Sequence, residues 1–251
     1  RWMSRDRLSE RYAGLSPYLY AAGAPSMNFD ADGDSVYVRH SYHVGLLGFL
    51  GIGRRVTEKA VYRDGGWYVS GTNTAFTSSN RKMNTLIAQA SKGISMIQKS
   101  GSTYSAHLAN AVASDSKHLM IRWGDNNTNG SIVGINGRSV DLNGLLKSGS
   151  GDMDTPRGLV AAHEIGHALN NMFGISNSPE FSSLPLVLHQ FPDGRFARRS
   201  EVVTVHLENL IRSKNGLALR EYYGVDSGNN VVRLLSPGSN CASLYPGNPC
   251  Y

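Results

Sequence analysis

The stretch Thr155-Pro-Arg-Gly-Leu-Val-Ala-Ala-His-Glu-Ile-Gly-His-Ala-Leu-Asn-Asn171 contains the pattern H-E-x-x-H, at His163, Glu164 and His167. On an α-helix, residues four positions apart lie one above the other, so the two imidazoles leave the same face and can bind one metal ion. Glu164 follows His163 directly, and its carboxylate can accept a proton from a metal-bound water. The pattern therefore predicts a zinc site with a general base beside it.

The residues around the pattern are typical of a buried helix. Thr155 can cap this helix, Pro156 fits its first position, and Gly174 stands just past its expected end. Apolar residues occupy positions all around the helix, which indicates burial on every side. They are Leu159, Val160, Ala162, Ile165, Ala168, Leu169 and Met172. Because a buried histidine pair needs a partner, this context favours a metal site over a chance match.

A third ligand must come from another part of the chain, because a catalytic zinc ion usually has three protein ligands and a water. The best candidate stretch is 199–212, which reads as a second helix and ends before Asn215-Gly216. It contains two glutamates, Glu201 and Glu208, seven positions apart and therefore on one helix face. We predict Glu201 as the ligand and Glu208 as a residue that positions a ligand or forms an ion pair.

Both glutamates also have a purely structural interpretation. Glu208 precedes Arg212 by four residues, so the two side chains can pair on the helix surface. An acid in the first helical turn, such as Glu201, is favoured by the helix dipole. His189, Asp193 and His206 remain further ligand candidates.

The two stretches resemble a known family, the effector-type bacterial zinc metallopeptidases. The matching residues are Thr155-Pro156, Ala161-Ala-His-Glu-Ile-Gly-His-Ala168, Glu201-x-x-Thr-Val-x-x-Glu208-Asn209-x-Ile-Arg212, Gly216 and Arg220-x-x-Tyr223. The resemblance covers roughly residues 80 to 225. It implies a gluzincin-like site with one zinc ion, in which His163, His167 and Glu201 are the ligands and Glu164 is the general base.

Arg220 and Tyr223 match a recurrent part of this family pattern, so the resemblance implies that they line the site. Either side chain can stabilise an oxyanion there, and Tyr223 is the preferred candidate. The alternative is that the two residues pack against the end of the helix.

The first 33 residues resemble the end of the core of Rhs and related polymorphic toxins. The matching residues are Arg1-Trp-Met-Ser-Arg-Asp6, Gly14-Leu-Ser-Pro-Tyr-Leu-Tyr20, Pro25 and Asn28-Phe-Asp-Ala-Asp-Gly33. In that family a large β-repeat shell precedes a variable toxin domain. The resemblance implies a junction segment over 1–33 and a metallopeptidase toxin domain over 34–251. Arg7 and Ala31 stand where the family usually has proline, so the resemblance does not extend to self-cleavage at the junction.

The toxin resemblance also supplies the expected biology. It implies a protein that is secreted, or injected by a bacterial delivery system into target cells, with a protein of the target cell as substrate. It further implies two partners, the Rhs-type shell of the parent chain and a cognate immunity protein. The start at Arg1, without an initiator methionine or signal peptide, fits a piece excised from a longer protein.

The remaining pattern predicts an α+β fold. We expect a zincin-like domain, with a small mixed sheet packed on the H-E-x-x-H helix and a second ligand-bearing helix. In zincins a strand near the metal helix pairs with the extended substrate, and one of the expected strands can do so. The expected elements are a strand over 35–39, a hairpin over 61–69 turning at Asp64-Gly65-Gly66, helices over 81–100 and 104–113, a strand over 118–123, a loop over 124–130, and strands over 131–134 and 139–142.

The charge distribution and the apolar stretch 45–53 bear on two classes of partner, nucleic acids and membranes. The net charge is +6, but the basic residues are spread along the chain, with only small pairs at Arg54-Arg55 and Arg198-Arg199. We therefore expect no nucleic-acid partner. The apolar stretch Gly45–Gly53 is far too short to cross a bilayer, so we expect a packed segment without stable membrane insertion. A membrane-active stretch is the alternative.

The two cysteines leave two possibilities. Cys241 and Cys250 can close a small disulfide loop in an oxidising compartment, or they can remain free thiols. A tail without regular structure is expected around them, over 236–250.

Three functional hypotheses follow from the sequence and its resemblances. The first is a toxin that hydrolyses peptide bonds of target-cell proteins with a zinc-activated water and Glu164 as the base. The second is a metallohydrolase that cuts the peptides of the bacterial cell wall. The third is a non-catalytic binding module in which the metal only stabilises the fold.

Overall fold

The computed structural model of the chain describes residues 36–45, 50, 53–114, 116–136, 138, 156–191, 194, 196–225 and 231–251. Several expectations fall outside these residues and stay predictions. They are the Rhs-like junction over 1–33, the strand over 139–142, the cap at Thr155, the ligand candidate Asp193 and most of the apolar stretch Gly45–Gly53.

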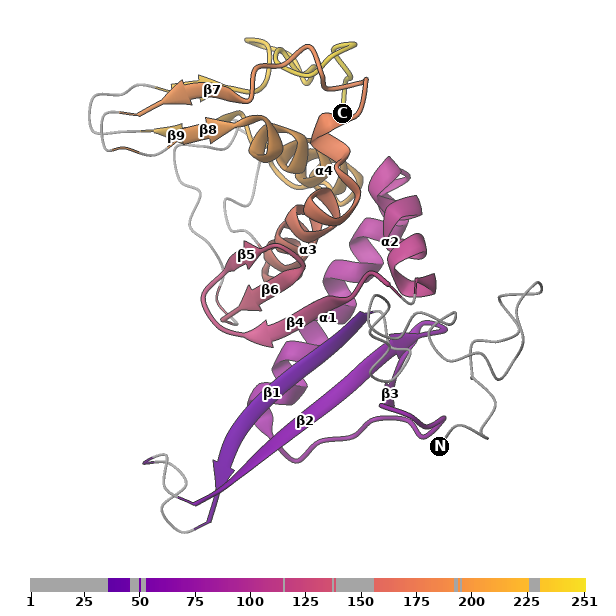
Figure 1. Ribbon diagram of the computed structural model, residues 1–251. Coiled ribbons are helices and arrows are strands. Elements are labelled where there is room, and N and C mark those ends of the chain that lie inside the picture. The colour runs from indigo at the N-terminus through magenta and orange to yellow at the C-terminus, as the bar shows by residue number, and fades with distance from the viewer. Residues whose placement is uncertain are drawn as a thin grey trace, which may run out of the picture.

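Six strands form one mixed sheet in the order β3-β2-β1-β4-β6-β5 (Figure 1). They are β1 (Val36–Val44), β2 (Arg54–Arg63), β3 (Gly66–Val69), β4 (Leu119–Trp123), β5 (Asn127–Asn129) and β6 (Ile132–Ile135). The β1–β4 and β4–β6 pairs are parallel, and the other pairs are antiparallel. The β2–β3 hairpin turns where predicted, with Asp64 and Gly65 both at positive φ, 50° and 77°, as tight hairpin turns require.

The prediction of a loop over 124–130 is wrong at its centre, because Asn127–Asn129 form the edge strand β5, antiparallel to β6. The sequence Asn-Thr-Asn has little intrinsic preference for a strand. Pairing with β6 therefore imposes this strand on a sequence that otherwise favours a turn. The strand is important because it lies beside the helix that carries H-E-x-x-H (Figure 1).

The four α-helices confirm the sequence pattern. They are α1 (Arg81–Ser100), α2 (Thr103–Ala113), α3 (Arg157–Phe173) and α4 (Arg199–Lys214), and a short 3-10 helix, η4 (Ile175–Asn177), follows α3. Helix α1 packs against β1 and β4 on one side and against α3 on the other, and α3 in turn packs against α4. The α3 helix is therefore buried between α1 and α4, as its apolar residues predict.

Two glycines allow the helices to approach α3 closely. A Cβ added to Gly93 of α1 would lie 2.8 Å from the main-chain nitrogen of Ala162 in α3. A Cβ added to Gly166 would lie 2.9 Å from Cδ2 of Leu207 in α4. Gly166 is one of the two variable positions of H-E-x-x-H, so its missing side chain brings the metal-site helix within reach of α4.

A smaller part of the molecule lies beyond α4, at the opposite end from β1 and β2 (Figure 1). It contains two two-stranded sheets, built from β7 (Val187–Gln190) with β8 (Phe196–Arg198) and from β9 (Tyr222–Val225) with β10 (Val231–Arg233). None of these short strands is predicted from the sequence. The C-terminal segment has no long element, as expected, and a disulfide joins Cys241 to Cys250. Of the two possibilities for Cys241 and Cys250, the structure therefore shows the disulfide.

The fold class is therefore α+β with a mixed sheet, as predicted. None of the helices in the described part of the chain is long and apolar enough to span a bilayer.

His206, one of the ligand candidates, instead holds the C-terminal segment against α4. Its ring centroid lies 3.8 Å from that of Tyr245, and its Nδ1 lies 2.5 Å from the hydroxyl of Tyr251. Burial lowers the pKa of His206 from 6.5 to about 4. The imidazole is therefore neutral in the folded chain at pH 7.

This buried histidine predicts a loss of stability in acid. Between pH 6.5 and about 4 the unfolded chain binds one more proton at His206 than the folded chain does, so the free energy of unfolding falls as the pH is lowered through this window. The loss from this one group approaches about 3 kcal/mol at the lower end. Urea titrations at both ends of the window will measure it, and the loss should be smaller by that amount in His206→Phe. Equal losses in both chains would contradict the assignment.

Candidate metal centre

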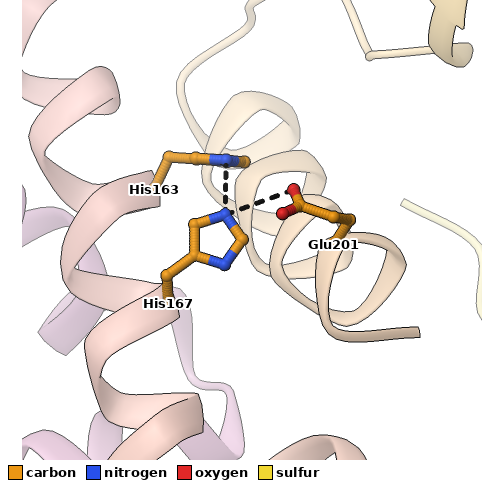
Figure 2. A group of neighbouring side chains, drawn as sticks. All are labelled: His163, His167 and Glu201. Carbon is orange, nitrogen blue, oxygen red and sulfur yellow. Dashed lines mark hydrogen bonds and ion pairs between the residues drawn. The ribbon is translucent and has the colours of Figure 1, made fainter. Parts of the chain in front are cut away.

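The three predicted ligands come together between α3 and α4. His163 and His167 extend from one face of α3, and Glu201 extends toward them from the first turn of α4 (Figure 2). The two Nε2 atoms are 3.1 Å apart, and Nε2 of His167 lies 3.3 Å from Oε2 of Glu201. All three ligand atoms lie within 4.8 Å of one another, which is close enough to hold one metal ion.

On the central part of α3, only His163 and His167 are accessible to solvent. From Gly158 to Asn170 every residue of α3 is buried except His163 and His167, which are partly exposed. The apolar residues that surround this helix therefore fix its rotation, and the rotation points both imidazoles at α4.

The spacing of the ligand atoms fits a small divalent ion. Nitrogen and oxygen atoms bound tetrahedrally to zinc at about 2.0–2.1 Å are about 3.3–3.4 Å apart. The separations between the two Nε2 atoms, 3.1 Å, and between Nε2 of His167 and Oε2 of Glu201, 3.3 Å, are close to this value. Two imidazoles with one carboxylate are also a donor set that zinc commonly takes.

The proton on His167 is placed by α4. Nδ1 of His167 lies 3.3 Å from Oγ1 of Thr204, and the Thr204 hydroxyl donates its own proton to the carbonyl oxygen of Ser200 at 2.9 Å. The threonine oxygen can therefore only accept from the ring. Nδ1 of His167 carries the proton, and Nε2 keeps a free lone pair.

The proton on His163 is placed by Glu208. Nδ1 of His163 lies 3.1 Å from Oε2 of Glu208, at ion-pair distance although not aligned as a well-formed hydrogen bond. The carboxylate favours a proton on Nδ1, so Nε2 of this ring also has a free lone pair. Two imidazole lone pairs and the Glu201 carboxylate thus converge. Lone pairs at these distances repel one another unless a metal ion or a proton lies between them.

The pKa values of the site follow from its burial and its close contacts. Burial alone would lower the pKa of His163, but the Glu208 carboxylate beside its ring raises it above the ordinary value. Burial alone would raise the pKa of Glu201, but its contact with His167 lowers it to about 2. Glu201 is therefore a carboxylate at physiological pH, as a metal ligand must be.

Glu208 is the centre of a buried ion-pair network. Its Oε1 accepts from Nε of Arg212 at 2.7 Å, and its Oε2 accepts from Nη1 of Arg220 at 3.1 Å. Glu208 is 2% exposed and Arg212 is 0% exposed. Burial would raise the pKa of Glu208, but Arg220 and His163 hold it well below its usual value. The predicted pairing of Glu208 with Arg212 is confirmed, but its predicted place on the helix surface is wrong.

Asn209 fixes the position of Arg220. Its side-chain oxygen accepts from the main-chain nitrogen of Arg220 at 2.7 Å, and its side-chain nitrogen donates to the carbonyl oxygen of the same residue at 3.0 Å. The guanidinium of Arg220 then donates to the carbonyl oxygens of Tyr222 and Tyr223, at 3.3 and 2.9 Å. Glu208, Asn209 and Arg212 of α4 thus form, with Arg220, one support behind His163.

Tyr223 lies next to this support. Its ring centroid is 5.7 Å from the guanidinium carbon of Arg220 and 6.4 Å from the ring centroid of Phe191. Arg220 itself packs at the helix as the alternative interpretation expects, and its guanidinium is occupied by Glu208 and by main-chain carbonyls. The role of Tyr223 as oxyanion donor stays a prediction.

Glu164 is held by a residue that the sequence does not reveal. Oγ1 of Thr128, in the edge strand β5, lies 2.8 Å from Oε2 of Glu164 and 2.9 Å from its carbonyl oxygen, and its one proton can go to either. Glu164 is 9% exposed and lies outside the group of metal ligands. No motif signals Thr128, because its contact with Glu164 arises only when β5 pairs with β6.

The ligand candidates His189 and His206 do not join the site. His189 lies on β7 with its ring against Phe191, at 4.7 Å between centroids, and His206 faces the C-terminal segment. His40 and His43 are strand residues of β1. In the described part of the chain, His163, His167 and Glu201 are the only such group close enough to hold a metal ion.

Comparisons of the chain with models of protein families, with curated proteins and with solved structures found no match.

Proposed function

We propose that the chain is a zinc-dependent peptidase of the zincin type. One zinc ion is held by His163, His167 and Glu201. The observation that carries the proposal is the convergence of two imidazole nitrogens and one carboxylate, with Nε2 atoms 3.1 Å apart. Two histidines with one carboxylate, and a further carboxylate beside them, form the donor set of a catalytic rather than a closed structural zinc site.

A zinc ion bound by these residues would lower the pKa of a water molecule and polarise the carbonyl of the substrate. Glu164 accepts the proton of that water and passes it to the leaving amine. Thr128 holds the Glu164 carboxylate in place through its hydroxyl. Thr204 and Glu208 keep the two imidazoles in the tautomer that a metal ion requires.

The edge strand β5 supports a peptide as the substrate. Among the described residues it is the last strand of the six-stranded sheet, with β6 on one side only. The backbone N–H and C=O groups on the other side of such a strand can pair with an extended peptide. Because Thr128 of β5 contacts Glu164, a peptide that is added to this edge runs past the general base.

The identity of the substrate and the route of delivery rest on the two resemblances. The likeness of α3 and α4 to effector-type metallopeptidases supports a protein of a target cell as substrate. The Rhs-like segment 1–33 supports a domain that is secreted or injected with its parent shell and is neutralised by an immunity protein. These statements belong to the proposal together with the peptidase activity.

The proposal is tested by labelling new amino termini in a cell proteome after incubation with the zinc-loaded chain. We expect new termini with the wild type and none with Glu164→Gln. A parallel incubation with purified cell-wall sacculi separates the two peptidase hypotheses. Peptide release from sacculi without new protein termini would shift the substrate to the cell wall, and no cleavage in either sample would contradict a peptidase.

Thr128 offers a test of the contact between β5 and the general base. Thr128→Val removes the hydroxyl at nearly constant volume, and we expect kcat to fall about tenfold, as for the loss of one hydrogen bond to a charged group. Zinc content and KM should stay near the wild-type values. Thr128→Ser keeps the hydroxyl and should restore most of kcat. A rise in KM at unchanged kcat would instead place Thr128 in substrate binding only.

A further inference from the structure

A cavity of about 490 Å³ lies on the sheet, away from the residues of the metal centre. The paired register of β1 and β4 ends at Arg39 and Arg122, and β1 then continues through His40 and Ser41. The cavity lies at this step in the sheet. Three strands supply its arginines, Arg39 from β1, Arg55 from β2 and Arg122 from β4.

The three arginines carry positive charge that the described residues do not neutralise. All three side chains are exposed, and none of the described residues that line the cavity is acidic. None of the ion pairs in the described part of the chain includes them. Arg39 is directly opposite Arg122 on one side and opposite Lys59 on the other. Like charges in such cross-strand positions destabilise a sheet, so an anion in the cavity would relieve this repulsion.

His40 and Trp123 border the cavity from the other face of the sheet. Successive residues of a strand point to opposite faces, so the His40 side chain points away from that of Arg39. Its ring packs against Tyr42 and Trp123, and its Nε2 atom is buried there. The charge that faces the cavity therefore comes from the three arginines.

We propose that this cavity, the arginine pocket formed by Arg39, Arg55 and Arg122, binds an anion that carries a phosphate group and more than one negative charge. Each guanidinium presents a planar fork of donors that matches two oxygens of one phosphate. A single carboxylate would balance only one of the three charges. The volume of the pocket lies in the range of about 300–1,000 Å³ that is typical of small-molecule sites.

The test uses the full chain and sodium tripolyphosphate as the probe, followed by isothermal titration calorimetry at low salt. We expect one saturable site, weakened about tenfold or more by Arg39→Gln or Arg122→Gln, as for the loss of a charge-assisted contact. Arg54→Gln is the matched control, because Arg54 is exposed next to Arg55 on β2 but does not line the pocket. The affinity of Arg54→Gln for tripolyphosphate should stay within about twofold of the wild-type value.

Three outcomes would overturn the proposal. They are the absence of saturable binding, an equal loss of affinity in Arg54→Gln, and equally tight binding of citrate, a carboxylate of similar charge. Thermal unfolding without ligand adds a further test. Arg122→Gln removes the repulsion between Arg39 and Arg122, so it should raise the melting temperature. A lowered melting temperature would contradict the cross-strand argument.

Lipid vesicles distinguish two possible sources of the phosphate group, a lipid headgroup and a soluble phosphorylated compound. Phosphatidylcholine vesicles with and without phosphatidic acid are sedimented with the chain. Co-sedimentation that needs phosphatidic acid and is competed by tripolyphosphate assigns the pocket to a lipid headgroup. Tripolyphosphate binding without co-sedimentation assigns it to a soluble phosphorylated compound. Co-sedimentation that Arg39→Gln does not weaken would exclude the pocket as the lipid site.

Discussion

Replacing Glu164 with Gln should lower kcat/KM for peptide hydrolysis by about a thousandfold and leave one zinc ion bound per chain. The amide has nearly the shape of the carboxylate but cannot accept the proton of the attacking water. Glu164 lies outside the group of metal ligands, so its replacement leaves His163, His167 and Glu201 in place. Fluorogenic peptide cleavage and metal analysis of the same sample measure both quantities.

Glu58→Gln is a matched control, because it makes the same replacement of Glu by Gln at a position away from the metal centre. Glu58 lies on β2 of the sheet, where it accepts hydrogen bonds from Tyr42 and Ser78. Glu58→Gln should therefore keep full peptidase activity. Activity of Glu164→Gln near that of the wild type would remove Glu164 from the mechanism. Loss of zinc from Glu164→Gln would show that Glu164 is a metal ligand.

Glu208→Ala should lower the free energy of unfolding by about 3–5 kcal/mol, the usual cost of breaking a buried ion pair from one side. The change leaves Arg212, which is fully buried, and Arg220 without their shared carboxylate. It also removes the group that keeps the proton on Nδ1 of His163, so zinc affinity should fall about 10- to 100-fold. Urea unfolding of the metal-free chain and zinc competition with a chelator measure the two effects separately.

Glu201→Ala is the informative comparison for Glu208→Ala. Glu201 is a proposed ligand, and its side chain is 27% exposed in contact with His167. Its loss should weaken zinc binding more than the loss of Glu208, while the metal-free chain should unfold at nearly the wild-type urea concentration. If Glu201→Ala instead destabilises the metal-free chain as much as Glu208→Ala does, the division between ligand and support is wrong.

The sequence predicts the helical part of the site well because helical periodicity is local information. The apolar positions of 81–100 recur at three and four residues, and α1 spans the same residues. Gly174 ends α3 in the left-handed conformation, as its place after the apolar run predicts. The i, i+4 spacing of His163 and His167 then fixes their common face before any tertiary contact is known.

The parts that the sequence does not reveal depend on pairing between distant segments. Strand β5 has the composition of a turn, and only its ladder with β6 makes it a strand and brings Thr128 to Glu164. The pairing of Glu208 with Arg212 follows from their spacing, but their burial depends on Arg220, which Asn209 holds from the opposite side. Spacing along one helix contains no information about such a third residue.

The basic residues show the same limit. Along the chain they are dispersed, which argues against a binding surface. The strand register nevertheless brings Arg39, Arg55 and Arg122 to one cavity, since β1 lies between β2 and β4. A count of charges in sequence windows cannot detect an arrangement that is made across strands.

The most direct test of the metal centre is a zinc titration of the metal-free chain against a chromogenic chelator. The proposed ligands predict one equivalent of tightly bound zinc, which is lost when His163, His167 or Glu201 is replaced by alanine. Absence of tight binding in the wild type, or a full equivalent retained in all three variants, would contradict a zinc site built from these residues.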